Sequence, residues 1–220
     1  MLESDVLKIF WDNKENIIPY NLSVSSNPKA ILLGGQGAVG KSYLVDIIKE
    51  DNEGRDFLSI NGDDFRIFHP GFHALVENEI KFPRETQVFS NVFTKNLIDI
   101  GAENKLNMIV EGTMRDPSVP ISTAEELKNK GYSVEAYIIA APKEISSIIG
   151  YSRYVEDRRN QGYGRMLDMK SHNQAANGLP KSIDELSDRG LVETLNYAAD
   201  QADWVFLCNV PVYSLRKSIV

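Results

Sequence analysis

The residues best suited to chemistry form one glycine-rich loop, residues 35–42. The loop satisfies the pattern G-x-x-x-x-G-K-[ST] and consists of Gly35, Gln36, Gly37, Ala38, Val39, Gly40, Lys41 and Ser42. Glycines let backbone N–H groups turn inward around a phosphate, and the start of the following helix adds a partial positive charge. Lys41 would place its ammonium near the β and γ phosphates, and Ser42 is the expected Mg²⁺ ligand. The loop predicts a nucleoside triphosphate site; the alternative is a turn that merely joins a strand to a helix.

Such a loop occurs in switch GTPases, motor ATPases and small-molecule kinases, so other residues must discriminate among these classes. The sequence has no N-K-x-D motif for reading guanine and no apolar strand that ends in D-x-x-G. A switch GTPase is therefore not supported.

Acidic residues follow two expected strands. Asp63 and Asp64 come after the apolar run 57–60, where a carboxylate could accept the proton of an acceptor hydroxyl in a kinase. The alternative is an Asn-Gly turn followed by a solvated acid, and the residues alone leave open which aspartate acts. Glu111 and Thr113 follow the run 106–110, where an acid would reach the Mg²⁺ shell or a substrate hydroxyl, unless Glu111 simply pairs with a nearby lysine.

Arginines gather in residues 151–165 around a glycine-bearing loop that resembles a lid. Arginines held over a triphosphate neutralise charge on the group being transferred. Arg158 and Arg159 are better explained as an exposed helix face paired with Glu156 or Asp157. Arg153 and Arg165 remain the candidates for a lid.

These residues need a scaffold that brings strand ends together. Short apolar runs at 30–34, 57–60, 106–110, 132–140 and 203–208 alternate with segments of helical spacing, including 85–101 and 143–159. The pattern predicts an α/β fold, a parallel sheet with helices on both faces, in which ligands bind beyond the carboxyl ends of the strands. Gly101 is expected to cap the first of these helices, Ser122 and Glu125 to form a capping box, and Gly131 to close the helix that follows it.

Length, composition and charge limit the remaining possibilities. The chain has 220 residues, 42% of them hydrophobic. Its 24 Lys and Arg residues against 31 Asp and Glu residues give a net charge of 24 − 31 = −7, so it lacks the excess of basic residues that is typical of a nucleic-acid binder. No apolar run is long enough to span a membrane, and a single cysteine excludes an intramolecular disulfide. We expect a cytoplasmic protein with no nucleic-acid or membrane partner. Residues 1–28 are expected to form a helical arm and linker, and residues 29–220 the catalytic domain.

Together these segments resemble a known family. The strings ILLGGQGAVGKS, NGDDFRIFHPGF, SNVFTKNLIDI, VEGTMRD, SRYVED with GRM, and NGLPKSIDEL occur in order over about residues 29–200. The series resembles the zeta toxin family of bacterial toxin–antitoxin systems, which are P-loop kinases. Members phosphorylate the sugar 3′-hydroxyl of UDP-N-acetylglucosamine with ATP or GTP and Mg²⁺, and a small helical antitoxin blocks their nucleotide site.

The resemblance implies roles for individual residues. The catalytic aspartate of the family falls on Asp63 rather than Asp64, and the residues that hold the sugar fall on Glu111 and Thr113. The two lid arginines that clamp the phosphates fall on Arg153 and Arg165, beside Lys41 of the loop.

The sequence departs from the family at Lys95, where a substrate-contacting glutamate is usual, so the charge beside the expected sugar is reversed. A cation in place of a hydrogen-bond acceptor can change specificity. A kinase with a different acceptor, and a nucleotide-dependent regulatory protein without transfer activity, are therefore the alternative functions. The loop also reads G-A-V-G-K-S where P-G-S-G-K-T is usual, which the general motif tolerates.

Overall fold

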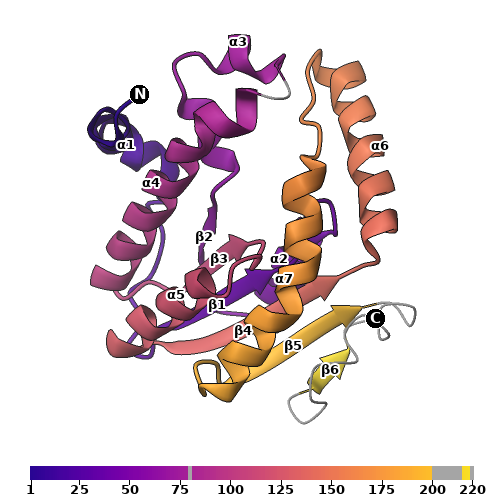
Figure 1. Cartoon of the computed structure of the whole chain (residues 1–220). Helices are drawn as coiled ribbons and strands as arrows, with labels where there is room; N and C mark the ends of the chain where they lie inside the picture. Colours follow the sequence, from indigo (N-terminus) through magenta and orange to yellow (C-terminus); the bar gives the residue numbers. More distant parts are fainter. Residues whose placement is uncertain (79–80, 200–214, 219–220) are drawn as a thin grey trace.

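The computed structural model describes residues 1–78, 81–199 and 215–218. Helices and strands alternate along the chain, which confirms the predicted α/β class (Figure 1). The helices are α1 (Glu3–Ile17), α2 (Lys41–Asp51), α3 (Phe72–Val76), α4 (Lys81–Glu103), α5 (Ser118–Asn129), α6 (Lys143–Gln161) and α7 (Met169–Asp188), with a 3₁₀ helix η1 (Asp64–Phe68). The strands are β1 (Lys29–Gly34), β2 (Leu58–Asn61), β3 (Met108–Gly112), β4 (Ser133–Ala140), β5 (Thr194–Ala199) and β6 (Leu215–Ser218).

The strands form one parallel sheet in the order β2-β3-β1-β4-β5-β6. Leu33 of β1 and Asn61 of β2 both lie opposite Glu111 of β3, so these strands end at the same level. The loops after β1, β2 and β3 therefore meet at one edge of the sheet. The fifth strand begins at Thr194, and the strand predicted at 203–208 lies outside the described residues.

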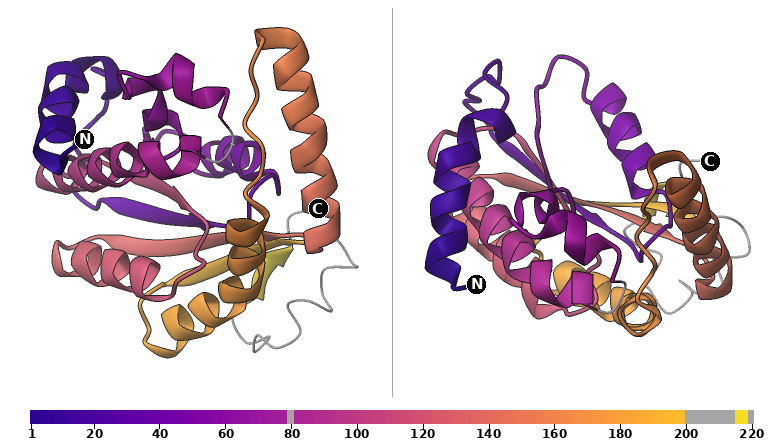
Figure 2. Two further views of the ribbon diagram at one scale, coloured as in Figure 1. Left: turned by 45° about the horizontal axis from the view of Figure 1, so that its top comes forward. Right: turned by 90° about the horizontal axis from the view of Figure 1, so that it is seen from above.

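Helices cover both faces of the sheet, but unequally. The larger core packs α4, α5 and α7 against one face, and the smaller core packs Leu44 and Ile48 of α2 against the other. The right view of Figure 2 shows α2 and α4 on opposite sides of the sheet. The predicted N-terminal helix is present as α1, and its buried Phe10 meets Phe93 of α4 edge to face at 5.2 Å. The arm thus shares the larger core.

Two predicted helix boundaries are wrong. Gly101 lies inside α4, because its missing side chain leaves room for Met108 of β3; the helix ends beyond it, with Lys105 in the left-handed region at φ 53°. Helix α5 begins at Ser118 instead of after Ser122, whose hydroxyl donates to the backbone carbonyl of Val119 within the helix. The predicted closure at Gly131 is confirmed, with φ 83° and the Tyr132 N–H bonded to the Leu127 carbonyl.

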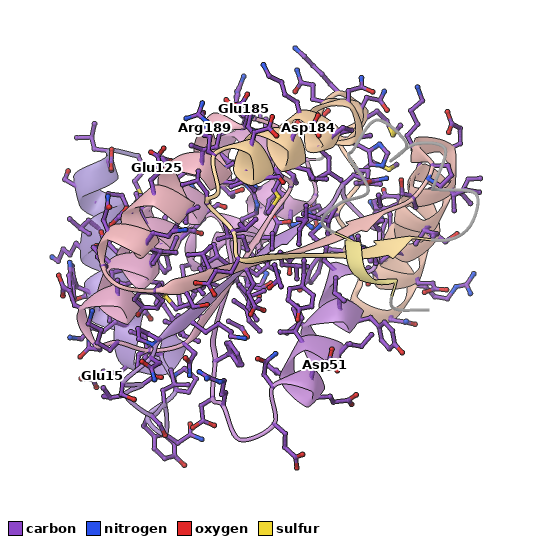
Figure 3. The ribbon with its side chains drawn as sticks, turned by 90° about the horizontal axis from the view of Figure 1, so that it is seen from below. Glu15, Asp51, Glu125, Asp184, Glu185 and Arg189 are labelled. Carbon is purple, nitrogen blue, oxygen red and sulfur yellow. The ribbon has the colours of Figure 1, made fainter. Side chains whose placement is uncertain are left out.

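Ion pairs join α5 to the end of α7. Arg189 lies 3.7 Å from Glu125 of α5 and 3.0 Å from Glu185 of α7. Figure 3 shows these three side chains grouped where the two helices meet. Within the described part of the chain, no helix combines the length and the apolar character that a membrane span requires.

Candidate active site

The phosphate loop joins β1 to α2 at the edge where the strands end. Two of its residues are in the left-handed region, Ala38 at φ 61° and Gly40 at φ 96°, which gives the tight turn that precedes the helix. Lys41 is the first residue of α2, and its Nζ donates to the carbonyl oxygens of Gly35 at 3.1 Å and Gln36 at 3.0 Å. The ammonium is therefore folded back over the loop, where the motif places a phosphate.

Glu111 faces Lys41 from the neighbouring strand. Lys41 Nζ lies 3.8 Å from Glu111 Oε1, and both side chains are largely buried. Burial lowers the pKa of Lys41, and the Glu111 carboxylate opposes that shift. Burial likewise raises the pKa of Glu111, with Lys41 as the main opposing charge. The acid at the end of β3 thus supports the charge on the lysine of the phosphate loop.

Asp63 is held between two arginines. Its Oδ1 accepts from Arg66 Nε at 2.8 Å, and its Oδ2 pairs with Arg165 Nη2 at 2.9 Å. Burial raises the pKa of Asp63, but the guanidiniums of Arg165 and Arg66 outweigh it and hold that pKa below the usual range. Asp63 is therefore an ionised carboxylate near the phosphate loop at neutral pH. Asp64 instead accepts from Asn61 Nδ2 at 3.1 Å, and its pKa is raised by burial and by Asp63.

A cleft of about 270 Å³ opens beside Asp63. It is lined by Asp63, Arg66 and Phe72 on one side and by Arg153, Tyr163 and Arg165 on the other. Tyr163, in the loop after α6, meets Phe72 of α3 edge to face at 5.9 Å. This contact joins α3 to the loop that carries Arg165, and in Figure 1 α3 and α6 stand opposite each other above the sheet.

The structure brings together most of the residues that the sequence singled out. The pKa of Lys41 is affected by the charges of four other residues, Glu111, Asp63, Arg153 and Arg165. These five groups therefore share one site. Ser42 is exposed in the first turn of α2, and Thr113 is exposed directly after β3.

Lys95 lies apart from this group. Its side chain is 72% exposed and pairs with Asp99 of the same helix at 3.5 Å. Arg158, assigned to an exposed face, donates to the hydroxyl of Tyr154 at 3.1 Å.

Sequence reasoning missed two sets of buried polar residues. Arg66 is nearly buried behind Asp63 and reaches α4. Below the phosphate loop, Gln36 Nε2 donates to the carbonyl of Ala141 and lies 3.4 Å from Ser146 Oγ, which in turn lies 2.8 Å from His172 Nε2. The partners are far apart in sequence, so no local spacing could have indicated them. The D-x-F-[RK] string did include Arg66 and was the one available signal.

A donor at the loop fits a magnesium ion. The hydroxyl of Ser42, in the first turn of α2, is a hard oxygen donor, the type that Mg²⁺ prefers. In the part of the chain that the structure describes, no three His, Cys, Asp or Glu side chains gather into a metal cluster. Mg²⁺ at this site would therefore take the rest of its ligands from nucleotide phosphates and water.

Comparison with known proteins decides the family. A sequence model of the zeta toxin family matches residues 14–209. The chain belongs to the zeta toxin family. This member is 33% identical over 186 residues to the toxin zeta of Enterococcus hirae, a match that covers 82% of the chain and 63% of that relative. It is 32% identical over 181 residues to the toxin PezT of Streptococcus pneumoniae serotype 4, covering 81% of the chain and 71% of PezT. The chain thus spans less than two thirds of the Enterococcus relative.

Solved structures agree with the family. The PezAT toxin–antitoxin system of Streptococcus pneumoniae aligns with this zeta toxin family member at a TM-score of 0.75 and 27% identity, covering 90% of this chain and 79% of the other. The AvrRxo1-ORF1:-ORF2 complex with ATP aligns at a TM-score of 0.56 and 16% identity, covering 91% and 60%, which shows a shared fold.

Proposed function

We propose that this protein is a kinase that transfers the γ-phosphoryl group of ATP or GTP to the sugar 3′-hydroxyl of UDP-N-acetylglucosamine. One observation carries the proposal: an ionised aspartate, a loop lysine and two arginines surround one site at the carboxyl edge of the sheet. Phosphoryl transfer needs little covalent chemistry from the protein, and positioning together with charge stabilisation accounts for most of the catalysis.

Each group has a role in this proposal. The backbone of the loop from Gly35 to Ser42 and the ammonium of Lys41 bind the phosphates. Asp63 accepts the proton of the acceptor hydroxyl, and Arg153 and Arg165 neutralise charge on the group being transferred. Glu111 and Thr113 hold the sugar. When bound, Mg²⁺ neutralises charge on the nucleotide phosphates, with Ser42 as its protein ligand.

The decisive experiment measures ADP release by the purified protein with ATP and Mg²⁺, with and without UDP-N-acetylglucosamine. A mass spectrum of the sugar nucleotide should show one added phosphate. Asp63→Asn should lower transfer roughly 100-fold or more, as expected on loss of a general base, while ATP binding is retained. Unchanged turnover in that variant would reject Asp63 as the base. ATP binding without ADP release stimulated by any acceptor would favour a regulatory protein that does not transfer phosphate.

A second candidate keeps the reaction and changes the acceptor. Lys95 is an exposed cation on α4 where the family has a glutamate, and under this alternative it selects a more anionic acceptor. Under this alternative, Lys95→Glu should shift preference towards UDP-N-acetylglucosamine, measured as the ratio of kcat/KM values for the competing acceptors. Lys8→Glu on α1 makes the same charge change on an exposed position and serves as the matched control. An unchanged ratio in Lys95→Glu would reject the alternative.

The relatives also suggest a partner. PezT is a toxin, and the solved PezAT structure is that of a toxin–antitoxin system. We propose that this chain likewise binds a small helical antitoxin, which covers its nucleotide site. Addition of such a partner should abolish ATP binding, measured by calorimetry, and simultaneous binding of both would contradict the proposal.

A further inference from the structure

Arg66 is a buried arginine directly behind the proposed base. It is 9% exposed and lies in η1, three positions after Asp63. Its Nη1 donates to the Pro83 carbonyl at 3.1 Å and to Thr86 Oγ1 at 2.8 Å, and its Nη2 donates to Gln87 Oε1 at 3.0 Å. Its Nε donates to Asp63 Oδ1 at 2.8 Å. The guanidinium therefore fixes the loop after β2 to the first turns of α4.

Asp63 supplies the negative charge that compensates for the buried guanidinium of Arg66. A buried cation is costly unless an anion and hydrogen-bond acceptors compensate for it. The acceptors that α4 supplies, a carbonyl, a hydroxyl and an amide oxygen, are all neutral. The Asp63 carboxylate is the anion bonded to this guanidinium in the described structure. The fork of the guanidinium is planar, so these bonds also fix the direction in which it faces Asp63.

The two oxygens of Asp63 consequently differ. Oδ1 faces the scaffold through Arg66, whereas Oδ2 faces Arg165, a residue that lines the cleft and comes from the loop after α6. Arg66 is held by α4 and cannot leave without losing several hydrogen bonds. Arg165 is about one third exposed and can exchange Asp63 for the phosphates of a nucleotide. Oδ2 is therefore the oxygen that an acceptor hydroxyl can reach.

We propose that Arg66 is a positioning residue for phosphoryl transfer, which holds Asp63 Oδ1 so that Oδ2 alone accepts the proton of the acceptor hydroxyl. This inference rests on the proposed kinase function. In the step, the acceptor oxygen forms a bond to the γ-phosphorus while its proton moves to Asp63 Oδ2. The bond between the γ-phosphorus and the β–γ bridging oxygen breaks, and ADP leaves with that electron pair.

Two variants of Arg66 separate charge from orientation. Arg66→Gln should lower kcat roughly 10- to 100-fold, the range expected when a reacting group is misplaced, with the KM for ATP nearly unchanged. It should also move the acid limb of the kcat–pH profile to higher pH, because loss of a neighbouring cation raises the pKa of Asp63. Arg66→Lys keeps the charge but loses the planar fork, so kcat should fall while the acid limb stays near that of the wild type.

Arg84→Gln provides the matched control. Arg84 lies on the same turns of α4 and is 75% exposed, with Glu85 as its ion-pair partner, so its replacement should leave both kcat and the pH profile unchanged. Should Arg66→Gln fail to fold, the Arg66→Lys profile still decides: a kcat equal to that of the wild type would overturn the role in orientation.

A double variant tests whether Arg66 acts through Asp63. In the Asp63→Asn background, Arg66→Gln should cause little further loss of transfer, because the group that it positions is already gone. A further 10- to 100-fold loss would overturn the proposal.

A titration of the free protein does not depend on the acceptor. The Asp63 carboxyl, followed by ¹³C NMR, should titrate at higher pH in Arg66→Gln than in the wild type, and an identical pKa would overturn the inference. If the wild type transfers no phosphate to any acceptor, this measurement still reports on the Arg66–Asp63 contact, so failure of the kinase proposal is distinguishable.

Discussion

Lys41 and Glu111 form a pair in which burial opposes both charges. Desolvation lowers the pKa of Lys41 and raises that of Glu111, while their mutual attraction acts in the opposite direction on each. A phosphate arriving at the loop requires the charged lysine. Besides its proposed contact with the sugar, Glu111 therefore favours the protonated form of Lys41.

This coupling predicts how Glu111→Gln changes the pH dependence of ATP binding. Loss of the carboxylate removes the main charge that raises the pKa of Lys41, so that pKa should fall further below 10.5. Affinity for ATP is lost as the pH rises through the pKa of Lys41, so the alkaline decline should begin at lower pH in the variant. Calorimetric Kd values between about pH 7 and 10 measure this shift.

Glu135→Gln is the matched control for that titration. Glu135 pairs with Lys29 at 2.7 Å near the start of β4, at the opposite end of the strands from the loop. Its replacement should leave the alkaline decline where it is. An unmoved decline in Glu111→Gln would mean that Glu111 does not govern the charge of Lys41.

Helices α6 and α7 hold the phosphate loop from below through buried polar contacts. Ser146 of α6 lies between Gln36 of the loop and His172 of α7, and all three side chains are buried. Gln36 Oε1 and His172 Nδ1 are buried without a partner among the described residues. These two buried atoms without partners already lower the stability of the fold. Loss of another hydrogen bond in the network should therefore lower it markedly further.

Ser146→Ala should destabilise the protein by about 1–3 kcal/mol, because His172 Nε2 loses its 2.8 Å partner inside the core. For a chain of this size, thermal unfolding should then shift down by roughly 2–12 °C. ATP should also bind more weakly, since Gln36 belongs to the loop. Ser147→Ala is the control: this neighbouring hydroxyl donates to the Lys143 carbonyl of its own helix, and its loss should matter little. Equal melting temperatures for the two variants would contradict a role for the network.

The sequence predicted the parts of the site that local spacing encodes. The loop motif lies between a strand and a helix, and the acids follow strands that end together, so Lys41, Asp63 and Glu111 could be placed at one edge. Gly101 was misassigned because its close contact with Met108 of β3, which the sequence does not reveal, places it inside α4. Ser122 was misassigned because α5 already begins at Ser118, whose N–H donates to Asp116 Oδ1 at 3.0 Å. The contacts of Arg66 with α4 and the contacts from Ser146 to Gln36 and His172 join residues 17 to 110 positions apart, which no spacing reveals.

The molecule as a whole places α7 against both sides of the site. Near its start, His172 meets the network below the phosphate loop. Further along, the buried Ser182 donates to the Met114 carbonyl at 2.6 Å, and Gly178 lies against the backbone of Arg115. Met114 and Arg115 directly follow Thr113, a proposed contact of the sugar. One helix thus contacts both the network below the phosphate loop and the segment after β3, and packs on the larger core between them.

Gly178→Ala should therefore affect stability and acceptor binding together. A Cβ at this position would overlap the carbonyl oxygen of Arg115 and lie 2.8 Å from its carbonyl carbon, and backbone cannot move aside as a flexible side chain can. Overpacking of this kind costs about 1–3 kcal/mol, more than the ~1 kcal/mol gained by replacing glycine with alanine inside a helix. The loop after β3 should shift, so the KM for the acceptor should rise while the Kd for ATP stays near that of the wild type.

Asn177→Ala, on the exposed side of the same turn, separates this close approach from helix propensity. It improves the intrinsic preference for helix without adding an atom near Arg115, so its melting temperature should equal or exceed that of the wild type. If Gly178→Ala melts as high as Asn177→Ala, the contact between α7 and the loop after β3 is not tight. A lower melting temperature with an unchanged acceptor KM would show that α7 stabilises the fold without positioning Thr113. Both effects together are expected, because the atoms that would collide belong to the segment that carries the proposed sugar contact.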